Sequence, residues 1–170
     1  VCEITGAQGA AAVVNGTCGL HACLLLSGVR PGDEVIVPAL TFVGPANAVT
    51  MACAVPHFID SEPGTLGLDP AVLDAHLGKV SERRNGECIN RATGRRIKAA
   101  VPVHVFGHPA HPADISRVCR RYSIEVIEGA AEALGTSFAG RHVGFDGKLA
   151  VLSFNGNKIA TAGGGGAVFS

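Results

Sequence analysis

Residues 97–127 read IKAAVPVHVFGHPAHPADISRVCRRYSIEVI, and this stretch decides the class of fold. The apolar runs Ile97–Val103 and Ile124–Ile127 are short enough to be buried strands. Between them, Ala113–Tyr122 has apolar residues at helical spacing and three arginines on the opposite side. A strand, a helix and a second strand in this order form a β-α-β unit, which is typical of a parallel sheet covered by helices.

The same alternation continues on both sides of this unit. We expect further strands at Glu34–Val37, Val55–Ile59, Leu149–Phe154 and Gly166–Phe169. Two more helices are expected at Gly19–Leu26, which is apolar nearly all round, and at Pro70–Val80. Asp69 is the predicted N-cap of the latter and Pro70 its first residue. The sequence therefore predicts an α/β fold with a mostly parallel sheet of six strands, flanked by helices.

Size and composition limit the classes of protein. The chain has 170 residues, of which 47% are hydrophobic and 16% charged, so residues 1–170 are expected to form a single core. Fourteen basic residues balance fourteen acidic ones, which gives no overall attraction to nucleic acid or to an anionic membrane. There is no apolar run of about eighteen residues and no basic segment at the start, so we expect neither a membrane span nor a signal peptide. Six cysteines without a C-x-x-C pair indicate free thiols and a cytoplasmic protein.

One segment departs from this charge balance. Residues 79–98 hold seven of the fourteen basic residues and two acids, for a local charge of +5. The segment is either a patch for phosphate or an acidic partner, or a solvated hairpin turned at Asn85-Gly86 and again at Thr93-Gly94. We favour the solvated hairpin, because arginine-rich loops most often only face water.

Two glycine-bearing segments have residues suited to cofactor chemistry. NGTCGL, residues 15–20, is a turn that opens a helix, where unpaired N–H groups and the helix dipole favour an anion such as phosphate. Thr17 is the expected cap and hydroxyl donor there. LSFNGNKIATAGGGG, residues 152–166, places Lys158 just past a strand end, where α/β proteins carry their sites. Each signal is weak alone, since such helix starts and loop lysines often bind nothing.

A third segment, IEGAAEALG at residues 127–135, places two carboxylates beside a strand end. There Glu128 and Glu132 could act as bases or contact a cofactor. Alternatively they are acids in the first turn of a short helix, favoured by its dipole.

Three histidines, His104, His108 and His111, have a spacing that suggests a metal site. The glycine and prolines among them forbid the continuous helix that would align their side chains. No acidic ligand follows before Asp114, so we predict no metal site.

Taken together and in this order, these segments resemble the DegT/DnrJ/StrS family of pyridoxal-phosphate-dependent sugar aminotransferases. The matching stretches are NGTCGLHA, PGDEVIVPALTFV (residues 31–43), ANAV (residues 46–49), PVHVFGHP, VIEGAAEALG and SFNGNK. The resemblance covers nearly the whole chain and implies the aspartate-aminotransferase fold, with residues 1–170 as its three-layer large domain and the cofactor at a dimer interface. Within the family, NGNK before a glycine run is most similar to enzymes that aminate UDP-linked 4-keto-6-deoxy-N-acetylhexosamines for bacterial surface sugars.

The resemblance also implies a role for each site residue. Lys158 matches the catalytic lysine that holds pyridoxal 5'-phosphate as a Schiff base and moves the proton during transfer. The phosphate cradle is matched by Gly16, Thr17, the backbone at Cys18, and Ser153. Phe42 matches the aromatic residue that lies against the pyridine ring, and Glu132 matches the residue that contacts the ring hydroxyl.

The chain departs from the family in two ways. Gly129 stands where the family has an aspartate that keeps the pyridine nitrogen protonated, so the electron sink should weaken. Glu128 is not expected to replace it, because neighbouring strand residues face opposite ways. Family members are also usually more than twice as long, so the chain is expected to be a core fragment without an N-terminal segment or a C-terminal small domain.

These observations predict the cofactor-binding core of a nucleotide-sugar aminotransferase, with glutamate as donor and weak or absent activity. The expected partners are a nucleotide sugar, an amino-acid donor and a second copy in a homodimer, with no nucleic acid and no membrane. The alternative is a non-catalytic degenerate core that serves as a binding or assembly module, which Gly129 favours and Lys158 opposes. Lys158 also argues against a dehydratase branch of the same family, which has histidine at this position. A dinucleotide-binding fold is not expected, because no G-x-G-x-x-G motif follows the first strand of this chain.

Overall fold

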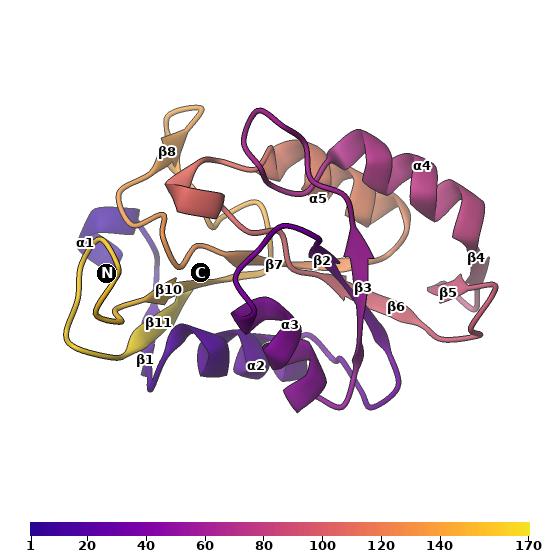
Figure 1. The fold of residues 1–170 in the computed structure, drawn as a ribbon, viewed down its shortest axis with the longest axis horizontal. Coiled ribbons are helices and arrows are strands. Elements are labelled where there is room, and N and C mark those ends of the chain that lie inside the picture. Colours follow the sequence, from indigo (N-terminus) through magenta and orange to yellow (C-terminus); the bar gives the residue numbers. More distant parts are fainter.

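The structure, a computed structural model, describes residues 1–170 and contains one mixed sheet of seven strands (Figure 1). In spatial order the strands are β1 (Ala10–Val13), β11 (Gly166–Phe169), β10 (Leu149–Ser153), β7 (Glu125–Gly129), β6 (Ile97–Ala100), β2 (Glu34–Pro38) and β3 (Val55–Ile59). The five strands from β10 to β3 are parallel, whereas β11 runs antiparallel to both of its neighbours. The predicted α/β class with a mostly parallel sheet is confirmed.

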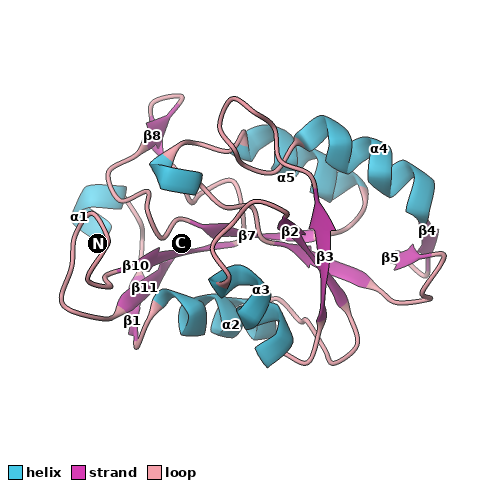
Figure 2. Cartoon of the chain, viewed as in Figure 1, coloured by secondary structure: helices cyan, strands magenta, loops and turns pink.

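Helices cover both faces of this sheet (Figure 2). The helices are α1 (Cys2–Thr5), α2 (Gly16–Leu26), α3 (Gly44–Met51), α4 (Pro70–Val80) and α5 (Pro112–Arg121), with a 3-10 turn at Val105–Gly107. The pair α2 and α3 packs on one face and the pair α4 and α5 on the other. None of these helices combines the length and apolarity needed to span a bilayer.

The pleat of β2 shows how the three layers are built. Val35 and Val37 belong to the same core cluster as Leu24 of α2, whereas Ile36 packs with Leu73 and the other cluster under α4 and α5. Because successive strand residues face opposite sides, an uninterrupted apolar run is needed to fill both cores. This explains why the strands read as continuous apolar runs in the sequence.

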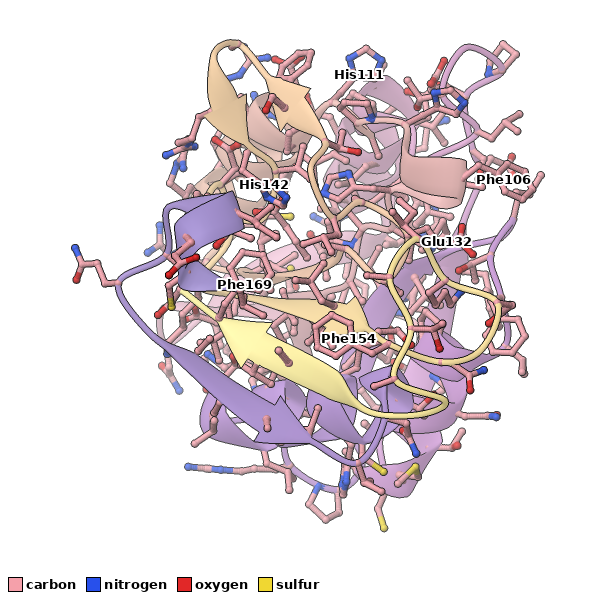
Figure 3. The ribbon with its side chains drawn as sticks, turned by 90° about the vertical axis from the view of Figure 1, so that its left-hand side faces the viewer. Phe106, His111, Glu132, His142, Phe154 and Phe169 are labelled. Atoms are coloured by element: carbon pink, nitrogen blue, oxygen red, sulfur yellow. The ribbon has the colours of Figure 1, made fainter.

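A third, smaller cluster lies under the loops around β11. Phe169 is almost completely buried, and its ring centroid is 5.6 Å from that of Phe145 and 6.1 Å from that of His142. Figure 3 shows Phe169 and His142 side by side in the interior. Edge-on contacts of this kind suit the charge distribution of aromatic rings.

Several elements were absent from the sequence-based expectation, among them the strand β1 and the helix α3, and with β1 the main sheet has seven strands rather than six. Strand β1 consists of three alanines and a valine that are mostly exposed. It is a strand because it pairs with β11, which is far away in the sequence. Helix α3 begins with Gly44 and Pro45, which resemble a turn in sequence. The predicted strand Ile97–Val103 ends at Ala100, because Pro102 has no N–H for the ladder, and β7 continues to Gly129.

Other local predictions are confirmed. Asp69 caps α4 by accepting hydrogen bonds from two backbone N–H groups, and Pro70 is the first residue of the helix. The basic segment forms a hairpin of β4 (Ser81–Arg84) and β5 (Glu87–Asn90) that turns at Asn85 and Gly86, both with positive φ. Arg96 departs from the expectation of a solvated loop, because its guanidinium is partly buried and donates hydrogen bonds to Asp33 and Glu87. A second small hairpin joins β8 (Ser137–Phe138) and β9 (Arg141–His142).

A polar cluster closes the amino end of the sheet. The carboxylate of Glu34, which is 4% exposed, accepts hydrogen bonds from Thr93, Asn90 and His57. His57 Nε2 in turn lies 2.8 Å from Nε2 of His76 on α4. One of these two nitrogens must lack a proton for the contact to be a hydrogen bond, so protonating both rings would bring two donors together.

This cluster predicts that acid weakens the fold. Burial, then the positive charges of His57 and Lys79, lower the pKa of His76 below its ordinary 6.5. Burial raises the pKa of Glu34, but its hydrogen bonds outweigh that effect and hold it below 4.5. Both groups bind fewer protons when folded, so their stability is present above their ordinary pKa values and is lost as pH falls. The urea concentration at the midpoint of unfolding should therefore be lower at about pH 5.5 than at about pH 7.5, because the unfolded chain binds a proton at His76 more readily than the folded chain.

His76→Gln should flatten this dependence, since glutamine does not titrate, while His108→Gln at an exposed histidine should leave it unchanged. An unaltered pH dependence in His76→Gln would contradict the assignment.

Candidate active site

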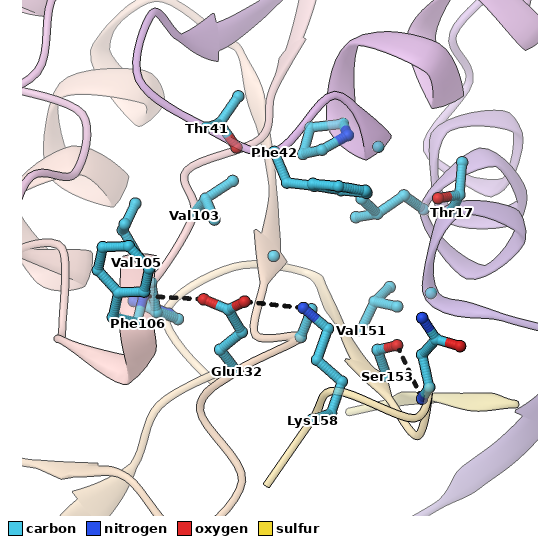
Figure 4. Close-up of a pocket in the computed structure, with 18 of the residues that line it drawn as sticks. Thr17, Thr41, Phe42, Val103, Val105, Phe106, Glu132, Val151, Ser153 and Lys158 are labelled. Carbon is cyan, nitrogen blue, oxygen red and sulfur yellow. Dashed lines mark hydrogen bonds and ion pairs between the residues drawn. The ribbon is translucent and has the colours of Figure 1, made fainter. Parts of the chain in front are cut away.

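A cavity of about 780 Å³ opens where the parallel strands end, between α2, α3 and the loops that follow β6, β7 and β10 (Figure 4). The carboxyl ends of parallel strands meet at one edge, which is where α/β proteins bind ligands. The lining includes seven of the residues singled out in the sequence, namely Gly16, Thr17, Phe42, Gly129, Glu132, Ser153 and Lys158. Segments far apart in the chain thus converge on one site.

Lys158 reaches into this cavity from the loop after β10. Its side chain is 11% exposed, and Nζ lies 2.8 Å from Oε1 of Glu132. The same nitrogen lies 5.9 Å from the centroid of the Phe42 ring, within the range of a cation–π contact. Lys158 is therefore held at two sides and its amine is placed inside the cavity rather than in bulk water.

Glu132 is held at both carboxylate oxygens. Oε1 accepts from Lys158, and Oε2 accepts from the backbone N–H of Phe106 at 2.9 Å. Burial raises the pKa of this carboxyl, but the hydrogen bonds from Lys158 and Phe106 outweigh burial and lower it below 4.5. Residues 130–135 form turns, so the expected alternative of a short helix here is wrong. Glu132 therefore stays ionised at neutral pH.

The amino end of α2 faces the cavity opposite Lys158. Asn15, not Thr17, is the N-cap, since its side chain accepts from Cys18 N at 2.8 Å; the prediction that Thr17 caps the helix is wrong. Asn15 lies just before the helix, so its side-chain carbonyl can accept from an N–H group of the first turn. Thr17 is already inside that turn and cannot serve as the cap. The Thr17 hydroxyl instead faces the cavity. Cys18 does not line the cavity, and its N–H is already engaged.

Gly16 and Ser153 lie close together across this end of the cavity. A Cβ atom added at Gly16 would be 3.2 Å from Ser153 Cβ and 3.5 Å from its Oγ. The absent side chain leaves room beside two hydroxyl groups and a helix start, where the dipole favours an anion. The Thr17 and Ser153 hydroxyl groups and the start of α2 are groups that can bind an anion such as phosphate.

Gly129 forms the floor of the cavity, at the end of β7. A Cβ there would be 3.1 Å from Val103 Cγ2, so the wall at this position is apolar and tightly packed. Glu128 faces the other way and is fully buried. The expected failure of Glu128 to replace an aspartate at 129 agrees with this geometry, because alternate strand residues point to opposite faces.

The cavity is also lined by two residues that the sequence analysis did not single out, Thr41 and Phe106. The Thr41 hydroxyl is buried and has no hydrogen-bond partner, so it is available to a ligand. Phe106 is 73% exposed at the rim of the cavity. Its backbone has φ 53°, a value that residues other than glycine seldom adopt. Phe42, which the resemblance did single out, is similarly exposed, at 74%. The left-handed backbone conformation of Phe106 cannot be predicted from a single sequence, because the surrounding loop imposes it.

The three histidines that resembled a metal trio are not brought together. His104 is completely buried against Glu128, whereas His111 is 42% exposed beside Glu62. The structure holds no group of three or more acidic, histidine or cysteine residues arranged to bind a metal ion.

Comparison with known proteins identifies the family. Residues 1–170 match the DegT/DnrJ/EryC1/StrS aminotransferase family, and the chain belongs to it. Pyridoxal phosphate is the cofactor of these aminotransferases.

Particular relatives agree with this family. The chain is 41% identical over 166 residues to GDP-perosamine synthase of Caulobacter vibrioides, covering 98% of this chain and 40% of that protein. It is 40% identical over 168 residues to EpsN of Bacillus subtilis, a candidate pyridoxal phosphate-dependent aminotransferase, covering 99% of this chain and 41% of that protein. The crystal structure of a family member from Brucella abortus matches with a TM-score of 0.87 at 30% identity, over 99% of this chain and 43% of the other. The chain thus spans about 40% of the length of these curated relatives.

The cavity fits pyridoxal phosphate in three respects and departs in one. It offers an amine for the aldehyde at Lys158, an aromatic face at Phe42, and an anion cradle between Gly16, Thr17 and Ser153. The wall at Gly129 offers no carboxylate to a pyridine nitrogen. The residues present can therefore hold the cofactor, while its ring nitrogen would lack a charged partner from that position.

The cradle predicts the effect of filling it. In Gly16→Ala the new methyl group would press on Ser153, and overpacking of about 1–3 kcal/mol should weaken binding of pyridoxal phosphate by about tenfold or more. Binding is measured by titrating the absorbance of the cofactor. Gly9→Ala, with open space around the new methyl group, is the matched control. Equal affinities in the two variants would contradict the assignment of the cradle.

Proposed function

We propose that this chain is the cofactor-holding part of a pyridoxal-phosphate-dependent aminotransferase that acts on a keto sugar carried by a nucleotide. The observation that carries the proposal is the Lys158 amine, enclosed at the end of a parallel sheet with an anion cradle across from it. The relative named GDP-perosamine synthase supports a nucleotide-sugar substrate. A 4-keto-6-deoxy sugar, destined for a bacterial surface polysaccharide, is the proposed acceptor, and glutamate is the proposed donor.

The chain's own residues suggest how this reaction is supported. Bound pyridoxal phosphate supplies an aldehyde carbon that bonds to amines and a ring that accepts electrons. Lys158 would hold that carbon through its Nζ, and the free Nζ would carry a proton between the substrate carbon and the cofactor carbon. Glu132 orients the Lys158 amine and would contact the ring hydroxyl of the bound cofactor. Phe42 would offer the ring a flat apolar surface that excludes water from one side.

We also propose that the protein acts as a homodimer, with the cofactor site near the interface. Leu25 and Leu26, at the end of α2, are 51% and 69% exposed, and Phe42 is exposed at the rim of the cavity. Exposed apolar side chains of this kind are typical of surfaces that a partner covers. A second copy is the partner that the resemblance implies.

The function is tested by trapping the bond to Lys158. Pyridoxal phosphate added to the purified chain should produce an absorption near ~420 nm, and borohydride followed by peptide mass analysis should place the cofactor on Lys158. Lys158→Ala should abolish both signals, since no other amine lines the cavity. Lys148→Ala, at an exposed lysine away from the cavity, should change neither. An absorption that survives in Lys158→Ala would refute the proposal.

A second candidate function is a non-catalytic module that binds the cofactor but does not transfer an amino group. Gly129 favours it, because an unprotonated ring nitrogen accepts electrons less readily. Binding without any half-reaction with glutamate would support this alternative over the first.

Restoring the missing carboxylate separates the two. Gly129→Asp combined with Val103→Ala, which makes room for the new side chain, should raise the rate of the glutamate half-reaction by about 10²-fold, the usual effect of one placed electrostatic group. The rate is followed from the loss of the ~420 nm absorption. Val103→Ala alone is the control, and an equal rate in both variants would contradict the role assigned to position 129.

A further inference from the structure

Glu128 is a buried carboxylate whose two oxygens are both fully used. Oε1 accepts from the N–H groups of Asp146 and Gly147 at 2.8 and 2.7 Å. Oε2 accepts from Gly144 N at 2.9 Å and lies 3.0 Å from His104 Nε2. Burial raises the pKa of Glu128, but these hydrogen bonds outweigh burial and lower it below 4.5. The carboxylate therefore ties the 144–147 loop to His104.

The tautomer of His104 follows from its two contacts. Its Nδ1 accepts from the backbone N–H of Ala110 at 3.1 Å, so the ring proton is on Nε2 and is donated to Glu128. A charged ring would place an Nδ1–H group against the Ala110 N–H. The ring and the carboxylate are both 0% exposed. The pair thus clamps both ends of the 104–110 segment without touching solvent.

The clamped segment carries the backbone donor that holds Glu132. Within it, Phe106 has φ 53° and Gly107 has φ 84°, and the Gly107 carbonyl accepts from Thr136 Oγ1 at 3.1 Å. A Cβ at Gly107 would lie 2.7 Å from the carbonyl oxygen of Glu132, so the two loops are in close contact. A non-glycine residue stays in this conformation only where its surroundings impose it.

We propose that Glu128 and His104 are positioning residues for the Lys158 site, holding the 104–110 segment so that the Phe106 N–H fixes the Glu132 carboxylate against Lys158. Figure 4 shows the last two links, from Phe106 to Glu132 and from Glu132 to Lys158. The pair acts through the backbone and touches neither Lys158 nor Glu132 through its own side chains. Its link to catalysis rests on the proposed function, whereas the positioning itself is a property of the ligand-free chain.

The positioning is tested without cofactor. In Glu128→Gln one amide hydrogen must face a backbone donor or the His104 N–H, so the 104–110 segment should loosen. Hydrogen exchange at the Phe106 amide should become about tenfold faster, because its local opening becomes easier. Lys158 should also be acetylated faster by acetic anhydride, relative to the exposed Lys79 of α4 in the same sample. His104→Gln, which removes the acceptor for Ala110 N–H, should have the same effects and serves if Glu128→Gln does not fold.

Two controls separate positioning from general loss of stability. Ile115→Val removes one methyl group from the core packed under α4 and α5, and it should destabilise the chain while leaving Phe106 exchange and Lys158 acetylation unchanged. In a Glu132→Gln background, Glu128→Gln should add no further change at Lys158, since the relay is already cut. The proposal is overturned if Glu128→Gln and His104→Gln leave Phe106 exchange at the wild-type rate, if Ile115→Val reproduces their effects, or if the effect at Lys158 persists in the Glu132→Gln background.

With pyridoxal phosphate added, both variants should form the Lys158 adduct about tenfold more slowly, because the amine is no longer held in one place. A wild-type chain that forms no adduct would refute the proposed function, while the exchange and acetylation results would still decide the positioning.

Discussion

Parallel pairing of β10, β7, β6 and β2 is the constraint on which the site depends. Parallel strands direct all of their carboxyl ends to one edge, so the loops that follow them must meet there. Lys158, Glu132, Phe106 and Phe42 come from four such loops, and the start of α2 closes the same space. The apolar runs that bury both faces of the sheet therefore also decide where the chemistry can occur.

The pleat of β7 gives adjacent residues opposite roles. Gly129 faces the cavity and contributes only backbone and space, while Glu128 faces the interior and keeps its charge by accepting four hydrogen bonds. A buried carboxylate is tolerated only with such complete pairing, because its desolvation is otherwise costly. The chain thus retains a buried acid beside the cavity wall at Gly129 but offers none to the cavity from that position.

Glu132 joins the rigid interior to the Lys158 amine. One of its oxygens is held by backbone and the other by Lys158, so the amine is oriented by a group that is itself fixed. Preorganisation of this kind lowers the entropy lost when a ligand arrives. The exposed rings of Phe42 and Phe106 at the rim give the same cavity an apolar entrance.

The sequence by itself determined the α/β class, the order of most strands and helices, and the position of Lys158, because apolar periodicity and turn residues are local signals. The capping of α4 by Asp69 and the hairpin turn at Asn85 follow from equally local chemistry. Only the tertiary structure decided that an alanine-rich segment becomes β1 and that the Phe106 N–H reaches Glu132. These features depend on contacts between residues distant in the chain, and no local pattern encodes the direction of a backbone N–H in a left-handed turn.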